Sequence, residues 1–448
     1  MKRVAIGICL ALTIVANLSP GRAQDASQRS ASVATDAENT EKQISVNPWV
    51  QAAKLISSSF EAYDFGNSVA ISGNTIVVGA PYGQSAFVFV RPKSGWENMI
   101  QAATLTASDE MSCGLFGNSV SISGNTIVVG DPQASPGCGP TQPGAAYVFV
   151  EPPGGWRGSL TQTAKLTASD GVVGDGVGNS VSISGNTIVA GAPGTYLSDA
   201  TGAAYVFVEP ANGWTNGTQT AKLVAADGEA NDQFGASVSI SGNTVAAGAL
   251  DATIGSNQAQ GAVYVYVEPP SGWKNMTQTA KLVASDGQQY DRLGTSVSTT
   301  GDTVATGAPN ATVGSNEGQG AAYVYAEPQG GWKSMTQTAK LTAKGGYAED
   351  AFGTSVAVDS NTAVAGSPNF SRSPEPISSP FFHEGAMYVF AEPATGWKIA
   401  SDPYRLTGSD ARFAAYLGTS LAISGHVALT GALFNNRTLG AAYIFEIP

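Results

Sequence analysis

Residues 178–193 read GNSVSISGNTIVAGAP, and residues 202–210 read GAAYVFVEP. Within the first stretch, Ser180 to Ser184 alternates polar and apolar side chains, with the period of two that a half-buried β-strand requires. The Gly-Asn pair that follows readily adopts the positive φ angle of a two-residue hairpin. Pro193 ends the returning strand, because proline has no N–H for a central ladder. The two stretches therefore predict a hairpin followed by a third strand.

The same pattern occurs seven times along the chain, at intervals of 51 to 65 residues. This interval is long enough for four short strands and too long for a two-helix repeat. We therefore predict an all-β fold, a seven-bladed β-propeller with four antiparallel strands per blade; an open β-solenoid is the rival, but its repeats are normally shorter. The first glycine of the pattern recurs at Gly66, Gly117, Gly178, Gly235, Gly294, Gly353 and Gly418.

The two ends of the repeat region predict how the ring closes. The last repeat ends near Phe445 without a tryptophan-containing strand of its own, whereas Trp49 has no repeat before it. Residues Trp49 to Leu55 can therefore form the outer strand of the last blade, so that the N-terminal strand closes the ring.

The first residues have the pattern of a secretory signal. Lys2 and Arg3 precede a mostly apolar run, which is shorter than the roughly 20 residues of a membrane span, and small residues end at Ala23. We expect residues 1–23 to be a cleaved signal peptide, although a retained anchor is the alternative, residues 24–47 a disordered polar leader, and residues 48–448 the propeller. The chain is then secreted, extracellular or periplasmic, either free or attached to the cell surface, with no membrane span after cleavage.

Charge and composition exclude several classes of function. The formal net charge of −12 disfavours nucleic acid and anionic membranes as partners. Two histidines and three cysteines leave little for a metal cluster or a disulfide scaffold, so we expect no metal and no cofactor. We also expect a monomer.

The run from Phe65-Gly66 to Gly79-Ala80-Pro81, with its copies, resembles the FG-GAP repeat. That family forms seven-bladed propellers, including the head of integrin α subunits, and the resemblance implies a role in binding or cell adhesion. Many integrin-type repeats carry an acidic calcium loop between their first two strands. Here that connection is only a short Ser-Gly-Asn-Thr turn, as in Ser184 to Thr187, without carboxylates for calcium.

The strand order predicts two faces of the ring. The Gly-Asn hairpins and the Glu-Pro-Gly-Trp turns form one face, which is nearly invariant among the copies and therefore serves folding. The loops after Gly-Ala-Pro and the links between blades form the other, the variable face, where function is expected. Its longest loop, residues 369–384, holds the candidate ligand contacts, because aromatic and arginine side chains dominate binding hot spots. These candidates are Phe370, Arg372, Phe381, Phe382 and His383. The alternative is that Phe381 and Phe382 pack onto the blade.

Acidic residues also gather at the variable face, in 170–175, 227–232, 286–291 and 349–350. They predict either turn hydrogen bonds or, less favoured, a divalent cation or cationic ligand. Lysines recur in the fourth strands, and we interpret them as solvated edge residues that oppose aggregation. They are Lys54, Lys165, Lys222, Lys281 and Lys340.

Two further features concern chemistry. Cys113 and Cys138 flank one blade on the same face, and in an oxidising compartment we expect a disulfide between them, with free thiols as the alternative. His426 takes a hairpin position that is asparagine in most copies, which favours a turn role over a general base. We predict no catalytic residue.

Three functions are compatible with these patterns. The favoured one is a secreted or cell-surface, non-enzymatic scaffold that binds an extracellular protein or glycan through the variable face. The first alternative is a secreted carbohydrate-active hydrolase or lyase that uses carboxylates of that face. The second is a structural component of an extracellular matrix.

Overall fold

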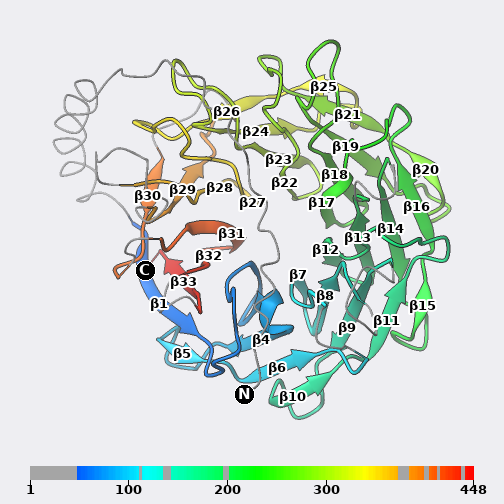
Figure 1. Cartoon of the computed structure of the whole chain (residues 1–448), viewed down its shortest axis with the longest axis vertical. Coiled ribbons are helices and arrows are strands. Elements are labelled where there is room, and N and C mark those ends of the chain that lie inside the picture. The colour runs from blue at the N-terminus through cyan, green and yellow to red at the C-terminus, as the bar shows by residue number, and fades with distance from the viewer. Residues whose placement is uncertain are drawn as a thin grey trace, which may run out of the picture.

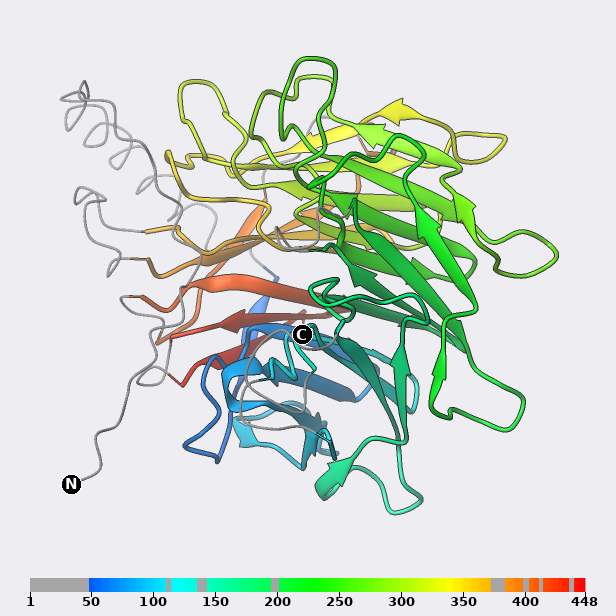
Figure 2. The ribbon, with the colours of Figure 1, turned by 45° about the vertical axis from the view of Figure 1, so that its right-hand side comes forward.

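A computed structural model shows seven β-sheets arranged as a closed ring (Figure 1). It describes residues 48–109, 114–134, 143–194, 201–371, 383–397, 403–410, 414–434 and 439–447. Blades 1 to 7 are numbered in chain order of their innermost strands. Those strands contact one another around the centre of the ring, and the sheets of neighbouring blades lie face against face (Figure 2). The prediction of a seven-bladed all-β propeller is confirmed.

The first two strands of each blade form the predicted hairpins, in which Gly73, Gly124, Gly185 and Gly242 have φ angles of 56° to 58°. The following asparagines keep a negative φ, so the turns are type II′ in character. The innermost strands are β2 (Ser68–Ser72), β7 (Ser119–Ser123), β12 (Ser180–Ser184), β17 (Phe234–Ser241), β22 (Ser296–Thr299), β27 (Val356–Asp359) and β31 (Leu417–Ser424). The second strands are β3 (Thr75–Ala80), β8 (Thr126–Asp131), β13 (Thr187–Ala192), β18 (Thr244–Ala249), β23 (Thr303–Ala308), β28 (Thr362–Ser367) and β32 (Val427–Ala432).

The third strands carry buried aromatic side chains, and the fourth strands lie at the outside of the ring. The third strands are β4 (Ser85–Val90), β9 (Ala145–Val150), β14 (Ala203–Val208), β19 (Ala262–Val267), β24 (Ala321–Ala326), β29 (Ala386–Ala391) and β33 (Ala441–Glu446). The fourth strands are β6 (Ala103–Thr106), β11 (Ala164–Thr167), β16 (Ala221–Val224), β21 (Ala280–Val283), β26 (Ala339–Leu341), β30 (Tyr404–Leu406) and β1 (Val50–Ile56). A short 3-10 helix, η1 (Pro81–Gly83), follows β3.

The ring closes as predicted. β1 pairs antiparallel with β33, with Leu55 opposite Ala442, so the earliest described strand completes the last blade. In Figure 1 the two strands lie side by side, blue against red. Across the same junction, the Ser420 hydroxyl donates a hydrogen bond of 2.7 Å to the Gly66 carbonyl of blade 1.

Five blades have a fifth strand that the sequence pattern does not predict. In these five cases the segment after a Gly-Trp turn is extended and runs parallel to the fourth strand of the preceding blade, where it covers that edge. At these five junctions a blade therefore reaches back onto its neighbour, and the edge is closed by backbone pairing. The fifth strands are β10 (Gly158–Thr161), β15 (Gly217–Thr218), β20 (Met276–Thr277), β25 (Met335–Thr336) and β5 (Met99–Ile100).

The blades meet through close backbone contact and aromatic packing. At each junction the glycine of Gly-Ala-Pro or its equivalent lies so close to the next blade that a Cβ there would collide with a carbonyl oxygen. Within blade 4 the Phe234 ring packs edge-on against Tyr264 and Tyr266, with ring centroids 5.6 and 6.0 Å apart, and the three rings share a buried cluster with Val189 and Val206 of blade 3. The junctions are therefore specified by small and large residues at fixed places in the repeat.

The recurrent lysines are not solvated edge residues, and that prediction is wrong. Each one pairs with an aspartate at the end of the preceding blade's fourth strand, with Nζ to Oδ2 distances of 2.6 Å. Each Nζ also lies 5.1 to 5.4 Å from the centroid of a tyrosine ring of its own blade. The lysines therefore join neighbouring blades. The pairs are Lys54–Asp410, Lys165–Asp109, Lys222–Asp170, Lys281–Asp227 and Lys340–Asp286.

These pairs predict an acid-sensitive component of stability. Burial would raise the pKa of Asp170, Asp227 and Asp286, but the hydrogen bond and charge of the paired lysine outweigh it and lower the pKa below its usual value. Because the folded-state pKa is lowered, the stabilisation is present above about pH 4, the unfolded value, and is lost as the pH falls through the folded-state pKa.

A variant with Lys222, Lys281 and Lys340 all replaced by methionine should test this dependence. We expect it to be less stable than the wild type at pH 7, by at most about 1 kcal/mol per pair because the aspartates are nearly half exposed. The difference in unfolding free energy, measured by urea denaturation, should shrink at pH 3. A difference that stays constant between pH 7 and pH 3 contradicts the proposed role of these pairs.

Candidate functional site

The variable face consists of the loops between second and third strands and the links from each fourth strand to the next blade. Within the described residues, five aromatic side chains are strongly exposed, and all five lie on this face. Large exposed apolar surface that folding does not use is typical of a binding surface. The five residues, with their exposed fractions, are Phe60 (86%), Tyr63 (51%), Tyr82 (57%), Tyr290 (52%) and Phe434 (43%).

Three of these rings lie together on blade 1. Phe60 and Tyr63 belong to the link between β1 and β2, and Tyr82 lies in η1. The two segments touch, since a Cβ on Gly83 would collide with the Glu61 carbonyl. Glycine at this position allows the two loops to approach and brings their aromatic side chains onto one surface.

Three aromatic residues from separate loops form a chain on blades 6 and 7. The His383 and Tyr416 rings are 5.4 Å apart at an angle of 48°, and Tyr416 meets Phe434 edge-on at 5.6 Å. The Asn369 carbonyl oxygen lies 2.7 Å from His383 Nδ1 and holds the imidazole in place. The loop after β32 meets blade 1: Phe65 N donates to Leu439 O at 3.1 Å, and Gly440, which pairs with Phe65, lies against the carbonyl of Leu433, the residue before Phe434. We name Phe60, Tyr63, Tyr82, His383, Tyr416 and Phe434 the aromatic sector.

Of the five ligand contacts predicted from the sequence, the structure describes two, Phe370 and His383. The Phe370 ring is only 2% exposed and lies beneath the guanidinium of Arg405, 4.6 Å from its carbon. It therefore anchors the start of its loop, and its buried ring offers no surface to a ligand. His383 belongs to the aromatic sector. Arg372, Phe381 and Phe382 lie outside the described residues and stay predictions, as do Cys113, Cys138 and the signal peptide.

Of the aromatic sector, sequence reasoning predicted only His383 and missed Phe60, Tyr63, Tyr82, Tyr416 and Phe434. None of these five lies in the longest variable loop, residues 369–384. The sequence signal for Tyr416 was an aromatic residue at a place where other copies have a small or polar one, such as Gly176 and Gln233. A copy-by-copy comparison of the links could have found Tyr416.

The acidic residues of the variable face serve turns and blade junctions. The carboxylates of Asp175, Asp232, Asp291 and Asp350 each accept a hydrogen bond from the backbone N–H three residues earlier, at 2.7 to 2.9 Å. Burial raises the pKa of Asp232 and Asp291. Asp170, Asp227 and Asp286 pair with lysines, as described above. Of the two interpretations, the turn interpretation is therefore confirmed for the first four residues.

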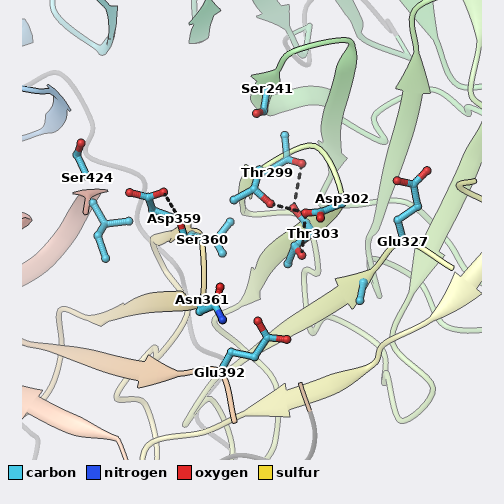
Figure 3. Close-up of a pocket in the computed structure, with 14 residues that line it drawn as sticks. Ser241, Thr299, Asp302, Thr303, Glu327, Asp359, Ser360, Asn361, Glu392 and Ser424 are labelled. Atoms are coloured by element: carbon cyan, nitrogen blue, oxygen red, sulfur yellow. Dashed lines mark hydrogen bonds between the residues drawn. The ribbon is translucent and has the colours of Figure 1, made fainter. Parts of the chain in front are cut away.

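The opposite face, which we expected to be nearly invariant, contains a pocket of about 710 Å³ (Figure 3). It opens between the inner hairpins of blades 4 to 7, where blades 5 and 6 depart from the common hairpin sequence. Figure 3 shows carboxylates around it from separate strand ends. Those that line it are Asp302, Glu327, Asp359 and Glu392.

Three of these four carboxylates accept hydrogen bonds from hairpins or turns of the protein itself. Asp359 Oδ2 accepts from Gly425 N of blade 7 at 2.5 Å, and the hydroxyl oxygen of Ser123 in blade 2 accepts in the same way from Gly185 N of blade 3 at 3.1 Å. Asp302 Oδ1 accepts from the Thr300 hydroxyl, and Glu392 Oε1 accepts from Trp397 N. These groups brace hairpins and turns, so we place the functional surface on the variable face.

The comparison with known families agrees with this architecture. A model of the FG-GAP repeat matches residues 49–89, 99–149, 160–207, 217–266, 276–325, 335–390 and 401–445. The chain belongs to the FG-GAP repeat family. Each match runs from the outer strand of one blade into the first three strands of the next, which is how β1 comes to complete blade 7. A comparison with curated proteins gives no significant match.

Two features of this FG-GAP propeller bear on its chemistry. Its hairpins lack the acidic loop, and the described residues contain no group of three histidine, cysteine or acidic side chains placed to hold a metal ion. His426 lies in the hairpin between β31 and β32, on the face opposite the aromatic sector, which confirms its turn position. The described part of the chain contains no helix with the length and hydropathy of a membrane span.

Proposed function

We propose that this FG-GAP propeller is an exported, non-enzymatic scaffold that binds an extracellular protein through the aromatic sector. The family and fold suggest a binding scaffold in general. The signal-like pattern of residues 1–23 supports export, and the net charge of −12 disfavours nucleic acid and anionic membranes as partners. The exposed aromatic rings of blades 1 and 7, with the half-buried rings of His383 and Tyr416 beside Phe434, carry the proposal.

The geometry of these rings favours a protein over a flat sugar chain. The rings of His383, Tyr416 and Phe434 meet at 48° and 77°, so they present edges as well as faces. Aromatic side chains in such arrangements fill pockets of a partner and supply most of the energy of a protein interface. Loops of three blades contribute to the sector, and a rigid ring holds them in place, which reduces the entropy lost on binding.

The two histidines of the chain lie on opposite faces of the ring, His383 on the variable face and His426 in the hairpin between β31 and β32. They therefore cannot act together as an acid and a base. Seven aspartates of the variable face are engaged in turns or in lysine pairs. Release of reducing ends from a polysaccharide panel would instead favour the hydrolase alternative.

A differential capture experiment tests the proposal. Immobilised wild-type protein and the double variant Tyr82→Ser, Phe434→Ser are exposed to the native extracellular medium, and retained proteins are identified. We expect a polypeptide that the wild type retains and that the double variant retains at least tenfold less, because exposed aromatic anchors dominate such interfaces.

The matched control is Tyr290→Ser, which removes an equally exposed tyrosine from the same face on blades 4 and 5. We expect it to retain the polypeptide as the wild type does. All variants should keep the wild-type melting temperature, since the replaced side chains lie at the surface. Equal retention by the double variant, or no retained polypeptide, refutes the proposed function.

A further inference from the structure

A second exposed aromatic site lies away from the aromatic sector, where the link between β21 and β22 meets the loops after β18 and β23. Three hydrogen bonds fix Tyr290 there. Its N–H donates to the Gln258 carbonyl at 2.9 Å, its hydroxyl donates to Gln258 Oε1 at 3.0 Å, and its carbonyl accepts from Asn310 Nδ2 at 3.1 Å. The side chain nevertheless stays half exposed, at 52%. The ring is therefore held in position and open to solvent.

Polar groups surround this ring. Arg292, two residues further on, forms an ion pair with Asp251, in which Nε lies 3.2 Å from Oδ1 without hydrogen-bond geometry, and Asp251 Oδ2 accepts a hydrogen bond from Gln233. The pair uses the Nε edge of the guanidinium. Its Nη donors make no hydrogen bond to the described residues and remain for a ligand. Aromatic, guanidinium and amide groups thus lie along one short stretch of surface.

The neighbouring blade shows that folding does not need these side chains. Glu349 holds the position of Tyr290 in the next link, with a φ of 66° against 68°. It makes the same two backbone contacts, from its N–H to Glu317 O and from Asn369 Nδ2 to its carbonyl, at 2.9 and 3.0 Å. The loop therefore forms equally well with glutamate in place of tyrosine.

The backbone conformation of this link does not require tyrosine or arginine. Tyr290 and Arg292 both lie in the left-handed region, at φ 68° and 60°. Asn231 and Gln233 hold the matching places in the link to blade 4, with φ angles of 70° and 56°. The identity of the two side chains in the link to blade 5 is therefore free to serve a role at the surface.

We propose that Tyr290, with Gln258, Asn310 and Arg292, forms a binding site for a neutral oligosaccharide. A pyranose ring has an apolar C–H face that packs on an aromatic ring, and hydroxyl groups at its rim that need planar donors and acceptors. The Tyr290 ring supplies a surface for the C–H face, and the amides of Gln258 and Asn310 and the guanidinium of Arg292 supply hydrogen-bonding groups for the hydroxyls.

The negative charge of the protein favours neutral glycans over acidic ones. The protein carries a net charge of −12, which repels polyanionic chains, and the charge of Arg292 is offset by Asp251. A neutral chain meets no such repulsion. This site lies on other blades than the aromatic sector, so each proposal can be tested, and refuted, independently of the other.

Titration calorimetry with four neutral hexasaccharides as probes tests the site: cellohexaose, laminarihexaose, mannohexaose and xylohexaose. We expect at least one of them to bind the wild type, and Tyr290→Glu, which copies the residue of blade 6, to weaken that binding at least tenfold. Tyr290→Phe keeps the ring and should bind within about threefold of the wild type.

Two controls make the result specific. Tyr82→Ala removes an equally exposed ring from the aromatic sector and should leave hexasaccharide binding unchanged, while an unchanged melting temperature shows that Tyr290→Glu is folded. Failure of all four probes at millimolar concentration overturns the proposal. Undiminished binding by folded Tyr290→Glu overturns it equally, whatever the capture experiment shows.

Discussion

Replacing Gly191 by alanine is expected to lower the free energy of unfolding by about 3 to 5 kcal/mol, a large effect for a single methyl group. Gly191 lies in β13, and a Cβ there would collide with the Gly235 carbonyl of blade 4 and with the Ser180 hydroxyl. The obstacle is backbone, which cannot turn aside as a side chain can. The blades would have to separate, and each junction is one link of a closed ring.

A series of glycines separates this cause from loss of flexibility. Gly154 has ordinary backbone angles and open space around its Cβ position, so Gly154→Ala should leave stability unchanged or raise it slightly. Gly185 also faces open space but has a φ of 58°, so Gly185→Ala should cost about 1 kcal/mol. Chemical denaturation measures all three. A cost for Gly191→Ala no larger than that for Gly185→Ala would disprove the contact explanation.

Loss of the closing strand is the second large effect. A protein that begins at Ser57 lacks β1, which leaves β33 with an unpaired edge and uncovers the core of blade 7. Leu55 and Ala53 are buried at 0% and 1% exposure, and Trp49 at 6%. Burial of a large apolar side chain stabilises by about 1.5 to 3 kcal/mol, so we expect a loss of at least about 5 kcal/mol or failure to fold. Calorimetry against a protein that begins at Pro48 measures the loss.

Point variants in the same strand keep this prediction testable if the truncated protein aggregates. Leu55→Ala should cost about 2 to 5 kcal/mol, because it leaves a cavity in the core between blades 7 and 1. Val50 belongs to the same strand but is 48% exposed, so Val50→Ala should change stability by no more than about 0.5 kcal/mol. Equal effects of the two variants, or full stability without β1, would show that the N-terminal strand does not hold the ring closed.

The fold could be predicted from the sequence because short-range signals within each repeat indicate where its strands begin and end. Alternation in residues such as 180–184, the Gly-Asn turns and the prolines after the second strands act over a few residues, and seven copies repeat the evidence. Even the closure by residues 49–55 could be deduced, since these residues form a fourth strand without a repeat before it, and the last repeat lacks a fourth strand of its own. The short fifth strands were missed because two-residue segments such as Met276–Thr277 carry no pattern and are extended only through a neighbour.

The site was harder to predict, because side-chain roles depend on partners far away in sequence. Lys222 was interpreted as a solvated edge lysine, yet it meets Asp170, 52 residues earlier. Phe370 belongs to the longest variable loop but turns into the core under Arg405. Tyr416 and Phe434 come from different loops and meet only in the folded ring.

The amino-acid sequence by itself determined the number of blades, their strands and the closure of the ring, since these depend on short-range periodicity and on counting copies. Only the tertiary structure decided which side chains face solvent, which aspartates pair with lysines and which aromatic rings meet. The physical reason is that burial and charge pairing are properties of neighbours in space, and a ring of seven blades brings together residues that are 50 or more positions apart in the chain.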